Sequence, residues 1–181
     1  MFFSNRTLTA TVTIPRRARE TITRSRGPKI GDTHIQLANW QALIKCLQAT
    51  GLRRQEARDL HCRDIHQHQD STITVHVTSG KGGKTRDIPV LPGREQDVLA
   101  VVAGRAPEEK VFPPIPTRID VHSYRREYAQ ALYLYYAPAD HQLPPPTGRL
   151  RPQDYDRGAA RRVSVALGHN RIDVIARHYL R

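Results

Sequence analysis

The stretch DVHSYRREYAQALYLYY, residues 120–136, predicts a long helix in this 181-residue chain. Pro138 ends the pattern, since proline cannot continue a helix. The apolar side chains that recur at helical spacing are Val121, Tyr124, Tyr128, Ala131 and Leu132. A chain of this length corresponds to one ordinary domain.

Two further helices are expected before this stretch. Asn39 is placed to cap the first, and Gly51 interrupts it. The second follows Leu52. The apolar stripe of the first helix is formed by Trp40, Leu43, Ile44 and Leu47.

A β-hairpin is expected between these helices and the long one. Residues 71–78 and 85–90 both alternate in polarity, and β-branched side chains are frequent in the first run. The glycine-rich, basic segment 79–84 forms the turn between them. It is not a phosphate-binding P-loop, because it lacks the Gly-Lys-Ser/Thr ending and joins two strands.

The rest of the chain predicts short helices and long loops. A helix is expected over 96–102, and proline-rich loops over 107–116 and 138–157. Two short helices flank Gly168, the last of them capped by Asn170. The sequence therefore predicts an α+β fold that is mainly α-helical, with a small antiparallel β-sheet.

The charge of the chain indicates an anionic partner. It has 29 Lys and Arg against 17 Asp and Glu, a formal net charge of +12, and 24 of the 29 basic residues are arginines. Arginine binds phosphate through two parallel hydrogen bonds, which makes nucleic acid the leading interpretation. The alternative is a generally basic protein whose arginines have no dedicated partner.

Basic residues are concentrated in residues 1–30, which hold six arginines and Lys29 against Glu20 alone. We interpret this segment as a basic arm or linker. The arginines expected to follow a DNA backbone are Arg16, Arg17 and Arg19.

The remaining composition favours a cytoplasmic protein. The two cysteines, Cys46 and Cys62, do not make a disulfide framework. No apolar run approaches the roughly 18 residues that span a bilayer, and the amino end lacks the apolar region of a secretory signal.

Five positions could carry chemistry, although each alone has an ordinary explanation. Arg53 starts a helix as a phosphate ligand or a surface residue, and Lys81 lies at the hairpin tip, where most lysines are merely solvated. His122 and Arg125, three residues apart, share one helix face and could grip one phosphate. Tyr179 could be a nucleophile or a packing residue.

The order of the motifs is more specific than any one of them. TGLRRQE at 50–56, GKG at 80–82, HSYR at 122–125, ALGH at 166–169 and HYL at 178–180 follow one another along the chain. Together they resemble the catalytic domain of the tyrosine recombinases, the phage-integrase family, from residue 31 to the end. The resemblance implies that residues 31–181 have that catalytic-domain fold.

The resemblance implies a scissile phosphate held by three side chains, with a carboxylate that supports them. Arg53 and Arg125 match the two family arginines that bind its non-bridging oxygens. His169 matches the position that hydrogen-bonds the phosphate. Glu56 matches an acidic position that supports the arginines.

The resemblance also implies which residues act as nucleophile and as proton donor or acceptor. Tyr179 matches the nucleophile, which forms a 3′-phosphotyrosyl link. His122 matches the residue that assists proton transfer at the tyrosine. Lys81 matches the general acid for the departing 5′ oxygen. Lys84 and Arg86, on the hairpin, are expected to contact DNA.

These groups need no metal, ATP or other cofactor, because guanidinium, imidazole and ammonium groups can stabilise the charge of phosphoryl transfer themselves. A zinc site is the alternative use of the histidine-rich segment after the second helix. Its spacing matches no familiar zinc pattern, which favours a polar turn. The possible ligands of such a zinc ion are His61, Cys62, His66, His68 and His76.

The expected function is site-specific DNA recombination or integration for a mobile genetic element, with double-stranded DNA and further copies of the chain as partners, a tetramer in the family. Thirty residues are too few for the family's separate DNA-binding domain, so an isolated catalytic domain, a truncated gene of a mobile element or a fragment of a longer protein is expected. A recombinase-derived module that binds DNA without cutting it and a type IB topoisomerase-like enzyme are the alternatives. No membrane or small-molecule substrate is expected.

Overall fold

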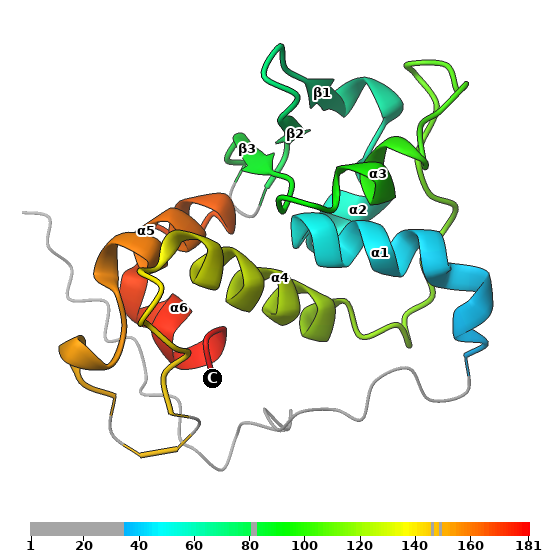
Figure 1. Ribbon diagram of the computed structural model, residues 1–181. Coiled ribbons are helices and arrows are strands. Elements are labelled where there is room, and N and C mark those ends of the chain that lie inside the picture. Colours follow the sequence, from blue (N-terminus) through cyan, green and yellow to red (C-terminus); the bar gives the residue numbers. More distant parts are fainter. Residues whose placement is uncertain (1–34, 81–82, 146, 149) are drawn as a thin grey trace, which may run out of the picture.

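The computed structural model describes residues 35–80, 83–145, 147–148 and 150–181. Helices make up most of its regular structure, and a small antiparallel sheet lies at one end (Figure 1). The predicted α+β class, mainly α-helical with a small antiparallel sheet, is confirmed. The helices are α1 (Gln41–Thr50), α2 (Arg54–Asp59), α3 (Glu95–Leu99), α4 (Val121–Tyr136), α5 (Arg157–Ala166) and α6 (Ile172–His178).

Helix α4 confirms the helix predicted at 120–136 and lies at the centre of the fold. The Asp120 side chain caps it by accepting a hydrogen bond from the Ser123 backbone N–H at 3.1 Å. Its apolar face, which includes Tyr128 and Leu132, is fully buried. The helix packs against α1 on one flank and α5 on the other. His122 and Arg125 thus lie in its first two turns, at the junction of several elements.

Helix α1 ends where the sequence predicts but begins differently. Gly51 takes the left-handed conformation, with φ +62°, and its N–H donates to Leu47 O at 2.7 Å. The prediction that Asn39 caps this helix is wrong, because the chain enters α1 through a 3₁₀ turn, Leu37–Trp40, that contains Asn39. The Asn39 side chain instead donates to Gln36 Oε1 at 3.3 Å.

The sheet contains the predicted hairpin and one strand that the sequence did not reveal. Strands β2 (Ile73–Val77) and β3 (Arg86–Pro89) pair antiparallel, with Val75 opposite Ile88. Strand β1 (Ile65–Gln67) adds to the other edge of β2. Three residues are too few to show a polarity alternation, which is why β1 was missed.

Helices α5 and α6 meet at a tight turn around Gly168. The His169 N–H donates to Ser164 O and the Gly168 N–H to Val165 O, each at 2.9 Å. The prediction that Asn170 caps α6 is wrong: Arg171 holds the cap position, and no side chain caps the helix. Asn170 instead takes a positive φ of 54°, which reverses the chain between the helices.

The remaining described elements are short. Helix α3 is shorter than the predicted 96–102 helix, and the loop predicted at 138–157 contains one 3₁₀ turn, Pro152–Asp154. Another such turn, Cys62–Asp64, precedes β1. Within the described ranges, no helix has both the length and the apolar character needed to cross a membrane.

Replacing Gly51 by alanine should destabilise the fold strongly. A Cβ there would lie 2.3 Å from Tyr128 Cδ1, on a backbone with positive φ. We expect Gly51→Ala to lower the free energy of unfolding by about 2–4 kcal/mol, from left-handed strain and overpacking together. Gly104, also at positive φ but with open space around its Cβ position, is the control. Gly104→Ala should cost only about 1 kcal/mol. Equal losses in urea denaturation would contradict this packing role for Gly51.

Candidate active site

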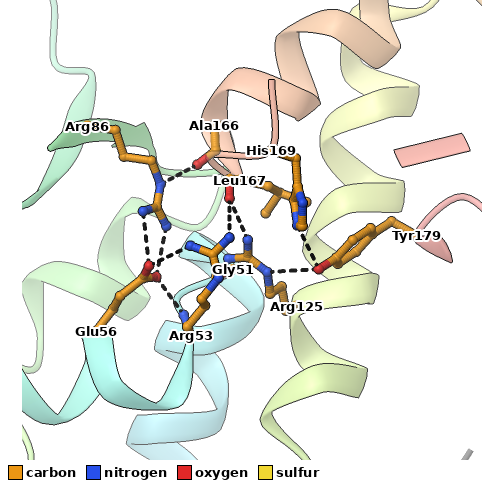
Figure 2. Close-up of polar contacts among 9 residues, drawn as sticks. All are labelled: Gly51, Arg53, Glu56, Arg86, Arg125, Ala166, Leu167, His169 and Tyr179. Atoms are coloured by element: carbon orange, nitrogen blue, oxygen red, sulfur yellow. Dashed lines mark hydrogen bonds and ion pairs between the residues drawn. The ribbon is translucent and has the colours of Figure 1, made fainter. Parts of the chain in front are cut away.

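Most of the residues matched to the catalytic motifs come together near the turn between α5 and α6, and Figure 2 shows Arg53, Glu56, Arg125, His169 and Tyr179. They come from the start of α2, the first turns of α4, the α5–α6 turn and the end of α6. The members that the structure describes are Arg53, Glu56, His122, Arg125, His169 and Tyr179. Lys81 and the predicted basic arm, residues 1–30 with Arg16, Arg17 and Arg19, lie outside the described residues.

Arg125 is the most deeply buried of these side chains, with 2% of its surface exposed. Its Nη1 donates to Gly51 O, its Nη2 to Leu167 O at 2.6 Å, and its Nε to the Tyr179 hydroxyl at 3.4 Å. Burial lowers the pKa of this guanidinium, and the neighbouring Tyr179 opposes the shift. Arg125 therefore joins the end of α1 to the carboxyl ends of α5 and α6.

The carbonyl end of α5 gathers two more arginines. Arg53 Nη2 donates to Leu167 O at 3.0 Å, so Arg53 and Arg125 share one acceptor (Figure 2). Arg86 Nε donates to Ala166 O at 2.9 Å. The last carbonyls of a helix lack intrahelical donors and carry partial negative charge, which suits them to bind guanidinium groups. We call Arg53, Arg86 and Arg125 the arginine cluster.

Glu56 is the carboxylate that balances this cluster. Its oxygens accept hydrogen bonds from Arg53 Nη1 at 2.8 Å and from Arg86 Nη1 and Nη2 at 2.9 and 2.8 Å. It also accepts from the Arg53 backbone N–H at 2.8 Å, at the start of α2. Burial acts to raise the pKa of Glu56, but these hydrogen bonds outweigh it and lower the pKa to about 2. Glu56 is therefore ionised at neutral pH.

Tyr179 places its hydroxyl among cationic and imidazole groups. The hydroxyl lies 3.0 Å from His169 Nε2 and accepts the hydrogen bond from Arg125 described above. The His122 ring meets the Tyr179 ring edge to face, with centroids 5.5 Å apart. Only 5% of Tyr179 is exposed. This arrangement can stabilise negative charge on the phenolic oxygen.

His122 lies beside this tyrosine on the first turn of α4. Partial burial lowers its pKa below the ordinary value of 6.5, and the charges of Arg126 and Arg125 act in the same direction. Asp120 opposes them, while His178 adds to the lowering. His122 is therefore neutral at pH 7 and able to accept a proton.

The two hairpin residues expected to contact DNA have different environments. Arg86 is largely buried, and its bonds are to Glu56 and to the end of α5. Lys84 is exposed and borders a small hollow of about 150 Å³ that Arg53 and Arg86 also line. No motif in the sequence indicates that Arg86 and Glu56 form an ion pair. A backbone acceptor such as Leu167 O also has no signature in a sequence.

The histidine-rich segment after α2 is the alternative candidate for a metal site. Among the described residues, His, Cys, Asp and Glu side chains form no group of three or more that could hold a metal ion. Cys62 is buried at the start of the 3₁₀ turn before β1, while the His66 ring meets the His76 ring at a centroid distance of 6.3 Å.

No family model and no curated protein matches the sequence. The fold is similar to the XerH site-specific recombinase bound to difH substrate in a pre-cleavage complex, at 19% identity and a TM-score of 0.49, over 80% of this chain and 43% of that chain. A post-cleavage complex of XerH with palindromic difH substrate gives 18% identity and a TM-score of 0.47, over 78% and 42%. The chain thus spans less than half the length of these recombinase chains.

Removing the Glu56 charge should destabilise the protein in a pH-dependent way. The pKa of about 2, against an ordinary 4.5, means that ionised Glu56 stabilises the fold above pH 4.5 and that this contribution is lost as the pH falls toward 2. We expect Glu56→Gln to cost about 3 kcal/mol at pH 7 and progressively less below pH 4.5. Urea denaturation at a series of pH values measures the difference.

Glu108 is the matched control, because it is exposed and makes no hydrogen bond or ion pair with any residue in the described ranges. Glu108→Gln should leave the stability profile unchanged. A Glu56→Gln deficit that stays constant from pH 7 to pH 2 would show that the cost is a packing effect rather than a loss of charge.

Proposed function

We propose that this chain breaks and rejoins DNA strands through a covalent 3′-phosphotyrosyl intermediate, as the catalytic unit of a site-specific recombinase or integrase. The observation that carries the proposal is the contact of the Tyr179 hydroxyl with Arg125 and His169, beside His122. A tyrosine held between a guanidinium and two imidazoles suits attack on a phosphodiester, because each neighbour can bind phosphate or take up a proton.

In the proposed reaction, the Tyr179 oxygen attacks the phosphorus and the bond to the 5′ oxygen breaks. The phenolic proton passes to His122, and the leaving oxygen takes a proton from Lys81. Arg53, Arg125 and His169 bind the non-bridging oxygens, where charge increases in the transition state. The three side chains act as preorganised donors because the protein already holds them in place.

Rejoining reverses these steps. A 5′ hydroxyl attacks the phosphotyrosyl ester, the new phosphodiester forms, and Tyr179 regains its proton. The ester conserves the energy of the broken bond, so the cycle requires neither ATP nor a metal. Strand exchange between two duplexes requires more than one copy of the chain on the DNA. We therefore propose that copies of the chain associate with one another when they are bound to DNA. Lys84 and the basic arm add backbone contacts, which strengthen DNA binding at low salt.

Tyr179→Phe should abolish covalent adduct formation. The substrate is a pool of nicked duplexes with randomised sequence around the nick. Cleavage near the nick releases a short fragment that carries the 5′ hydroxyl. Because this fragment diffuses away, the reaction cannot reverse and the phosphotyrosyl ester accumulates. We expect a denaturation-resistant protein–DNA adduct with the original chain and none with Tyr179→Phe. The control is Tyr135→Phe, since Tyr135 is 59% exposed on α4. An adduct with Tyr179→Phe would place the nucleophile elsewhere.

The same experiment distinguishes the other functions. A salt-dependent gel shift without any adduct would identify a non-catalytic DNA-binding module. Adduct formation with supercoil relaxation but no recombinant products would identify type IB topoisomerase-like activity.

The pH profile of adduct formation tests the role of His122. Because its pKa is lowered, we expect the rate to rise with pH below 6.5 and to level off by pH 7. His122→Gln should slow the reaction at pH 7 by about 10²-fold and flatten this rise. The control is His68→Gln, an exposed histidine that bonds Thr74. If the rate of adduct formation still rose with pH below 6.5 in His122→Gln, the group that titrates there would be another residue.

A further inference from the structure

A second basic hollow lies between α5 and α6, outside the cluster of catalytic candidates. It has a volume of about 540 Å³, and its lining includes Arg157, Arg161, Ser164, Val165 and Asn170. We call it the α5–α6 groove. The Ser164 hydroxyl is buried without a hydrogen-bond partner in the described structure, which adds an unsatisfied polar group to this wall.

Among the described residues, the arginine side chains of the groove have no acidic partner. Arg157 and Arg161 are exposed and four residues apart on α5, so they lie on one face in successive turns. Neither guanidinium makes a hydrogen bond or ion pair with another residue in the described ranges. The one acidic residue of the lining, Asp173, is already paired with Arg171, at 2.7 Å and 3.1 Å.

The groove also adjoins the candidate active site. Val165 and Asn170 line both it and the 150 Å³ hollow beside Arg53 and Arg86. A chain of phosphates could therefore pass from the arginine cluster across Val165 to Arg161. Val165 is 56% exposed, so its methyl groups are free to contact the sugar edge of such a strand.

We propose that the α5–α6 groove binds the DNA backbone beside the scissile phosphate, with Arg157 and Arg161 each contacting one phosphate. The inference rests on the proposed function, because it takes the strand that enters the active site as the ligand. A planar guanidinium binds phosphate through paired hydrogen bonds, and two of them one helix turn apart suit a polyanion better than a single small anion. These contacts position the strand and carry no sequence information.

The test compares two double variants of the full chain. Arg157→Gln/Arg161→Gln removes the groove charges, and Arg58→Gln/Arg63→Gln removes two exposed arginines from α2 and the turn before β1. Both lose the same net charge. Binding to a fluorescein-labelled 30-base-pair duplex is measured by anisotropy across a salt series, and thermal unfolding establishes that each variant is folded.

For the groove variant, we expect the slope of log affinity against log salt to become shallower by about 1.8, or 0.9 for each lost phosphate contact. The affinity at about 0.1 M salt should fall by more than tenfold. The control variant should change neither quantity by a comparable amount. Equal slopes for the two variants would overturn the inference. It would also be overturned if the groove variant lost only self-association in gel filtration, since the groove would then join copies of the chain.

The adduct experiment separates this inference from the proposed function. If the original chain forms the Tyr179 adduct while the two double variants bind DNA alike, the groove inference alone fails. If the slope changes as expected but no adduct forms, the groove is a DNA-binding site and the strand-transfer proposal fails.

Discussion

The carbonyl end of helix α5 is the feature on which the rest of the site depends. Leu167 O accepts hydrogen bonds from Arg53 and Arg125, and Ala166 O accepts one from Arg86. These arginines come from the start of α2, from α4 and from β3, so one helix end draws three distant segments together (Figure 2). A helix that ended one turn earlier would leave the guanidinium groups without their acceptors. The position of Gly168, which ends α5 with φ +66°, is therefore a constraint on the whole cluster.

Three guanidinium groups so close together would repel one another without a compensating charge, and Glu56 supplies it. The carboxylate bonds two of them and leaves Arg125 to backbone carbonyls and Tyr179. A buried ion pair that lacks one member is far more costly than an intact one, because the remaining charge is desolvated and unpaired. Glu56 therefore acts through the arginines: it fixes their orientation, and it is too fully engaged to act as a general base.

The sequence predicted the features that depend on local pattern and failed where tertiary contacts decide. The helix at 120–136 and the β2–β3 hairpin follow from periodicity and were found. The caps assigned to Asn39 and Asn170 were wrong, because a 3₁₀ turn precedes α1 and chain reversal requires a positive φ at Asn170. The motif order selected side chains that do converge in space. It could not reveal the shared Leu167 carbonyl, since backbone groups are the same in every residue, nor that Arg86 faces Glu56 rather than solvent.

In the proposed reaction, the exposure of the site residues determines which of them a phosphate meets first. The Arg53 side chain is 24% exposed and borders the small hollow, whereas Arg125 is 2% and Tyr179 5% exposed. A guanidinium offers five N–H donors, and the hydrogen bonds described here use two of those on Arg53. A phosphate can thus bind Arg53 first without displacing Glu56 or Leu167. Arg125 and Tyr179, which the phosphate also meets in the proposed reaction, are buried beside the α5–α6 turn that holds His169 and the shared carbonyl. For the proposed chemistry, that turn therefore keeps a phosphate ligand, His169, within 3.0 Å of the nucleophile.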